Sequence, residues 1–151
     1  MASGAVKTAI DINAKVIVVF SSSGRMASYI AKFRPRVSCL MITPDLVAAR
    51  QASGLLHGTH TVQVDSLENT EELIEETNFE LVASGDAQPG DKIVVVAGRK
   101  AGMREQLRIV ELQEGKSYGH FVKDAVELDS EERLHFSRDL LLKFGTSVRR
   151  I

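Results

Sequence analysis

KVIVVFSSSGR, residues 15–25, joins an apolar run typical of a buried β-strand to a turn rich in serine and glycine. A helical pattern follows directly, in which Met26, Ile30 and Phe33 recur at near-helical spacing until Pro35 makes continuation costly. The first N–H groups of a helix lack partners within the helix, so a strand that ends in such a turn makes a cradle for a phosphate. A plain strand-to-helix turn accounts for the same residues equally well, because serine and glycine are ordinary turn residues.

The turn holds several groups that would surround one anion. Three hydroxyls, the close backbone approach that a glycine permits and one guanidinium add to the N–H groups of the helix. The candidate phosphate ligands are Ser21, Ser22, Ser23, Gly24 and Arg25.

The composition is that of one soluble domain. With 151 residues, 44% of them hydrophobic and 26% charged, the chain is long enough to bury its own core. A formal charge of -1 argues against nucleic acid or a membrane surface as the main partner. The single cysteine, Cys39, is expected to pack as a small hydrophobe, and the absence of a disulfide framework fits a reducing compartment. Without a secretory signal in residues 1–14, or an apolar run near the ~20 residues that span a bilayer, the expected location is cytoplasmic.

Strand and helix patterns alternate along residues 1–112. The first residues resemble part of a short helix, and strands are expected at residues 15–20, 38–43, 60–64, 92–97 and 106–112. The last of these strands is more polar and suits a sheet edge. Together they predict a three-layer α/β fold, with helices on both faces of a mostly parallel five-stranded sheet that has one antiparallel edge strand.

The sequence predicts the ends of one intervening helix and the solvated face of another. One should start with Thr43 as N-cap, proline at the first helical position and Asp45 in the first turn, and should end at Gly54. The other spans residues 69–83, and its glutamates are expected on a solvated face. These are Glu71, Glu72, Glu75 and Glu76.

A second glycine-rich loop, GRKAGMRE, follows the strand at residues 92–97. Ligands of open α/β sheets bind at the carboxyl ends of the strands, so this loop and the serine turn are expected to face each other. Its cations would then lie opposite the helix N-terminus, although simple solvation explains charged glycine loops as well. The candidate residues are Gly98, Arg99, Lys100, Gly102 and Arg104.

The sequence contains no convincing catalytic or metal site. The four histidines are scattered without metal-ligand spacing, and Gly115-Lys116-Ser117 lacks the first glycine of a phosphate-binding loop. Residues 113–151 form a separate C-terminal extension. In it, Asp129 and Glu132 offer a capping box for a helix with an apolar stripe, which is expected to dock on the domain or on a partner. The stripe consists of Phe136, Leu140 and Phe144.

IVVFSSSGRMASYIAKFRPRVSCLMIT, residues 17–43, closely resembles the C-terminal domain of the pyruvate kinase family. Lys32-Phe33-Arg34-Pro35 matches the family's (K/R)-(F/Y)-R-P motif, and Gly90-Asp91 with the strand that follows matches a second family pattern. The resemblance covers residues 4–112.

The resemblance implies a regulatory domain of a glycolytic kinase that binds a phosphorylated effector and assembles into a homo-oligomer. It implies that residues 21–25 hold the effector phosphate and that residues 98–105 close over the sugar. Phosphotransfer from phosphoenolpyruvate to ADP, with magnesium and potassium, would occur on a separate catalytic barrel domain. Because such a barrel takes about 250 residues, we expect no cofactor and no activity in this chain. The alternative is a mainly structural domain that mediates oligomerisation without an effector.

The chain also departs from the family pattern. Met26 stands where many effector-binding members carry serine or threonine, and acidic residues follow Asp65 where an arginine would bind a second phosphate. Carboxylates repel an anion, so these departures argue against a fructose 1,6-bisphosphate site of the animal type.

Overall fold

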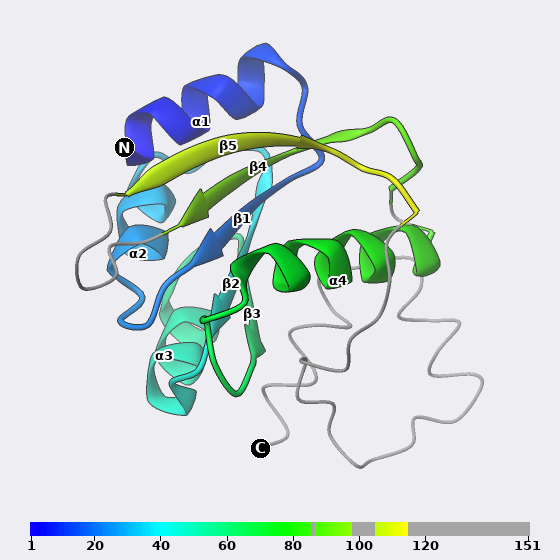
Figure 1. Cartoon of the computed structure of the whole chain (residues 1–151). Coiled ribbons are helices and arrows are strands. Elements are labelled where there is room, and N and C mark those ends of the chain that lie inside the picture. The colour runs from blue at the N-terminus through cyan, green and yellow to red at the C-terminus, as the bar shows by residue number, and fades with distance from the viewer. Residues whose placement is uncertain (86, 98–104, 115–151) are drawn as a thin grey trace, which may run out of the picture.

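A computed structural model describes residues 1–85, 87–97 and 105–114 (Figure 1). Its helices are α1 (Ala2–Asp11), α2 (Arg25–Lys32), α3 (Leu46–Leu55) and α4 (Thr70–Ala83). Its strands are β1 (Val16–Phe20), β2 (Ser38–Thr43), β3 (Thr59–Gln63), β4 (Lys92–Ala97) and β5 (Gln106–Glu111). They form a five-stranded sheet in the order β3-β2-β1-β4-β5, in which only the β4–β5 pair is antiparallel. The predicted α/β fold with one antiparallel edge strand is therefore confirmed.

The order of the strands reverses between β1 and β4. β2 and then β3 are added on one side of β1, and the chain then crosses back so that β4 pairs with the other side of β1. Phe20, the last residue of β1, lies opposite both Ile42 of β2 and Ala97 of β4. β1 and β4 consequently end next to each other, at the carboxyl end of the parallel strands, as the sequence predicted.

β1 is apolar throughout and β4 is apolar after Lys92, because helices cover both faces of the sheet (Figure 1). Side chains alternate along each strand, so Val18 packs on the α4 side, whereas Ile17 and Val19 pack on the side of α1 and α2. Met41 of β2 contributes to a smaller cluster with Ala48 of α3. One helix, α4, thus lies on one face of the sheet, and α1, α2 and α3 lie on the other.

Helix α3 differs from its prediction at both ends. Asp45, and not Thr43, is the N-cap, and its carboxylate accepts a hydrogen bond of 2.9 Å from the Val47 N–H. Thr43 is still part of β2 and fully buried, so its backbone continues the sheet. Gly54 lies inside the helix, which continues to Leu55, because the helix ends only where Leu56 becomes extended.

One glutamate takes an environment opposite to the one predicted, and one aromatic side chain lies outside the core. Glu76 is fully buried, although it was expected on a solvated face of α4. Phe33 is 52% exposed because α2 ends at Lys32 and leaves this residue at the C-cap, outside the buried stripe of Met26 and Ile30. The strand bounds at residues 38–43 and 92–97 are confirmed. β1 and β5 deviate by one residue at one end, and β3 lies one residue earlier than predicted at both ends.

Several expectations lie outside the described residues. They concern the loop at residues 98–104 and the capped helix of the C-terminal extension. Within the part of the chain that the structure describes, no helix is both long enough and apolar enough to cross a membrane.

Candidate functional site: the turn between β1 and α2

Ser21 holds the start of the turn in place. Its N–H donates to the Ile42 carbonyl oxygen at 3.1 Å, which extends the pairing of β1 with β2 by one residue. Its Oγ accepts a hydrogen bond of 3.0 Å from the Gly24 N–H, and the residue is buried. A serine hydroxyl that accepts one bond still has its own proton to donate. Ser21 therefore shapes the turn and retains one donor.

Gly24 begins the helix in a conformation that favours glycine. It is the N-cap of α2 with φ of 75°, and its carbonyl oxygen accepts the Ser28 N–H at 3.0 Å. No side chain caps this end of the helix, and no acidic residue occupies its first turn. The N-terminus of α2 therefore keeps the partial positive charge that attracts an anion.

The other predicted ligands surround this helix end. Ser22, Ser23 and Arg25 are all exposed, and together with Gly24 they lie between the buried Ser21 and the buried Met26. Two hydroxyls and one guanidinium are thus exposed on one short segment at the start of α2. Hydrogen bonds from a guanidinium to phosphate oxygens are among the stronger ones in proteins.

The second predicted loop begins beside this turn. Ala97, at the end of β4, is the register partner of Phe20, the residue before Ser21. The loop residues named from the sequence lie outside the described residues. They are Gly98, Arg99, Lys100, Gly102 and Arg104.

A third segment at the same edge was missed by sequence reasoning. The turn after β2 is closed by Thr43 Oγ1, which accepts the Asp45 N–H at 3.2 Å, and Asp45 in turn caps α3. Because Ser21 bonds to Ile42, this turn lies next to the serine turn. The predicted parallel pairing of the first two strands would have placed these two turns next to each other. Of these two helix starts, one is closed by a carboxylate and the other, at α2, is open to an outside anion.

The described residues of the site have features for binding an anion. In the described ranges, no group of three or more histidine, cysteine or acidic side chains could hold a metal ion. Burial raises the pKa of the Cys39 thiol to about 12. The thiol is therefore protonated at neutral pH and unsuited to act as a nucleophile.

Comparisons with known proteins agree with this architecture. Residues 1–110 match the family model described as "Pyruvate kinase, alpha/beta domain". A pyruvate kinase of Staphylococcus saprophyticus is 31% identical over 140 residues, which cover 83% of this chain and 24% of the relative. A pyruvate kinase of Agrobacterium vitis is 33% identical over 114 residues, which cover 74% of this chain and 24% of the relative.

Solved structures give the same result. Cryptosporidium parvum pyruvate kinase in complex with ADP superimposes with a TM-score of 0.69 at 26% identity. The superposition covers 74% of this chain and 23% of that one. The chain thus spans about a quarter of the length of the proteins it matches.

Proposed function

Because the chain belongs to the family of the pyruvate kinase alpha/beta domain, the C-terminal domain of a glycolytic enzyme, we propose that it is a regulatory domain. It binds a phosphorylated small molecule at the turn between β1 and α2. The phosphate accepts hydrogen bonds from Ser22, Ser23, Arg25 and the first N–H groups of α2. Ser21 and Gly24 hold the turn in the shape that this requires. The cytoplasm, where glycolytic sugar phosphates occur, is the location that fits this role.

The observation that carries the proposal is the difference between two neighbouring helix starts. α3 is capped by the carboxylate of Asp45, which satisfies the Val47 N–H. α2 has no capping side chain, and exposed donors surround its first turn. A helix start with this combination binds an anion with both its dipole and its free N–H groups.

The loop after β4 supplies the regulatory step. Residues 98–105 begin beside the turn and carry Arg99, Lys100 and Arg104, which would bind the same ligand from the opposite side. Gly98 and Gly102 would let the loop close. An effector changes an equilibrium only if it binds one arrangement more tightly than another, so closure of this loop is the arrangement that the effector selects.

Calorimetric titration of the chain with inorganic phosphate, sugar phosphates and nucleotides tests the proposal. We expect at least one phosphorylated ligand to bind, and Arg25→Ala to weaken it by about 1.5–3 kcal/mol, the usual contribution of a hydrogen bond to a charged group. Arg36→Ala is the matched control, because this exposed arginine lies beyond α2. If no ligand binds, or if Arg25→Ala and Arg36→Ala bind equally well, the proposal is wrong.

A second candidate function is subunit assembly, either alone or together with effector binding. β5 is at an edge of the sheet, and Ile109 on it is 52% exposed. Exposed edge strands are ready to pair with another chain. Light scattering should then detect a dimer that Ile109→Lys dissociates. A dimer with no response to any phosphorylated ligand would favour a purely structural role, and a monomer at all concentrations would exclude assembly through β5.

Catalysis belongs, in this proposal, to a barrel domain on another part of a pyruvate kinase, and that domain is the second partner. Phosphotransfer from phosphoenolpyruvate to ADP, assayed with magnesium and potassium present, should therefore give no turnover with this chain alone. Measurable turnover would contradict the assignment of a purely regulatory role.

A further inference from the structure

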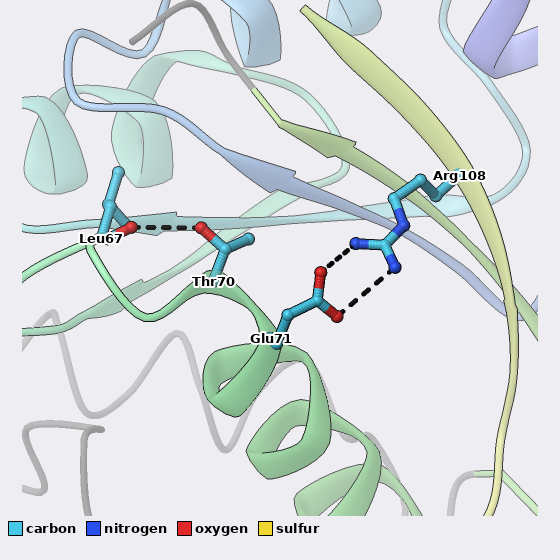
Figure 2. Close-up of polar contacts among 4 residues, drawn as sticks. All are labelled: Leu67, Thr70, Glu71 and Arg108. Carbon is cyan, nitrogen blue, oxygen red and sulfur yellow. Dashed lines mark hydrogen bonds and ion pairs between the residues drawn. The ribbon is translucent and has the colours of Figure 1, made fainter. Parts of the chain in front are cut away.

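The charges of this chain are separated between the two faces of the sheet. Residues 12–44, which include β1 and α2, contain five lysine and arginine residues and no acidic residue. Residues 65–91, which include α4, contain nine acidic residues and no lysine or arginine. α2 packs on one face of the sheet and α4 packs on the other. The formal charge of -1 is therefore the sum of a basic and an acidic part, and it does not exclude a polyanion from the surface of α2. Figure 2 shows that on the acidic side Glu71 is paired with Arg108 of β5.

The end of α2 exposes two aromatic rings on the basic side. Tyr29 is 49% exposed and Phe33 is 52% exposed. They are four residues apart, so their Cβ atoms lie about 5–6 Å from each other along one side of the helix. Neither ring belongs to the clusters that form the core. Aromatic side chains supply much of the contact area in cores and interfaces, so two neighbouring exposed rings indicate a surface for a partner.

Three cations accompany the rings. The Lys32 Nζ lies 5.3 Å from the centre of the Tyr29 ring, in a cation–π contact. Arg34 and Arg36 come just after the helix, and both are exposed. Within the described ranges none of these three cations forms an ion pair, so their charge is available to a partner. Together with Phe33, these four residues make up what we call the aromatic–basic surface.

A second copy of the chain does not fit this surface by two-fold pairing. Such pairing places the same patch of each subunit opposite itself, which would bring the three cations of one copy against those of the other. No acidic residue occurs in residues 12–44 to offset this repulsion. The partner must therefore be anionic and must also cover aromatic rings.

We propose that the aromatic–basic surface binds single-stranded nucleic acid. Each nucleotide supplies one phosphate for a cation and one base that stacks on an aromatic ring. The carboxylates of an acidic peptide would pair with the cations but offer nothing to stack on the rings, and a duplex keeps its bases inside its own stack. The surface includes none of residues 21–25, so the proposal is independent of the ligand at the turn between β1 and α2.

Fluorescence anisotropy of a labelled oligothymidylate of about 16 nucleotides, titrated with the full chain, tests the proposal. We expect saturable binding whose log–log salt dependence has a slope of about -2, because each of three phosphate contacts contributes about -0.7. Tyr29→Ala with Phe33→Ala should weaken binding at least about fivefold, the smallest effect expected for one stacked base. The matched control is Ile10→Ala with Val47→Ala, which removes exposed apolar side chains from α1 and α3 and should leave binding unchanged.

The tyrosine emission of the chain gives a readout that is specific to stacking. The sequence contains no tryptophan and two tyrosines, so the Tyr118→Phe variant has Tyr29 as its only source of this emission. We expect unlabelled oligothymidylate to quench the emission of Tyr29. Inorganic polyphosphate, which carries the charges without the bases, should leave it unchanged.

The proposal is wrong if oligothymidylate does not bind at low salt, or if it binds without quenching Tyr29. It is also wrong if the Tyr29→Ala/Phe33→Ala variant binds as tightly as the wild type, or if polyphosphate competes as well as unlabelled oligothymidylate, because charge alone would then explain the binding. Polyglutamate that competes equally well would identify the partner as an acidic protein segment and would overturn the proposal too.

Discussion

Replacing Gly24 by alanine isolates the conformational demand of the turn between β1 and α2. At φ of 75°, the added Cβ would have the Met41 Sδ as its nearest neighbour, at 3.7 Å, which is an ordinary van der Waals distance. The effect is therefore one of the backbone and not of packing. The left-handed conformation costs a residue with a side chain roughly 1–2 kcal/mol. The reduced freedom of the unfolded chain offsets about 0.4–1 kcal/mol of this cost.

Gly24→Ala should accordingly lower the free energy of unfolding by about 1 kcal/mol. Gly54→Ala is the matched control, since Gly54 lies inside α3 with no heavy atom within 4 Å of the added Cβ. The same chemical change should there raise the free energy of unfolding by about 0.4–1 kcal/mol. Urea denaturation of both variants measures the two values. A Gly24→Ala protein as stable as the wild type would refute this description of the turn.

Two further predictions concern α3 and the core. Asp45→Ala should lower the free energy of unfolding by about 1 kcal/mol, because the Val47 N–H loses its hydrogen-bond acceptor. Asp45→Asn should keep most of the wild-type stability in the same denaturation assay, because asparagine also caps helices. Burial raises the pKa of Cys39 from 9.0 to about 12, so the unfolded chain loses this proton first. The stability that depends on the protonated thiol is complete below pH 9 and declines as the pH rises toward 12, a decline that Cys39→Ala should lack. Equal alkaline slopes for the two proteins would contradict the effect of burial.

The strands were predictable because burial on two faces leaves a strong pattern in the sequence. β2 and β4 have the bounds expected from their apolar runs. The parallel pairing of β1 with β4 places the serine turn after β1 next to the end of β4, where the second predicted loop begins. The position of the serine turn was also predictable, because the strand before it, its glycine and the helix after it are neighbours in the sequence.

The details that sequence reasoning missed depend on contacts between distant segments. Thr43 and Asp45 both belong to the residue types that cap helices, and the pairing of Thr43 in β2 leaves the role to Asp45. Glu76 belongs to a run of acidic residues of a kind that is usually solvated, yet it is fully buried. Gly54 continues a helix that its residue type would favour ending.

A crystal of the chain soaked with the tightest ligand from the calorimetric panel shows directly where the ligand binds. We predict a phosphate group at the N-terminus of α2, bonded to the hydroxyls of Ser22 and Ser23, to the Arg25 guanidinium and to the first N–H groups of the helix. A phosphate bound at any other surface, or none at a concentration that saturates the chain in solution, would contradict it.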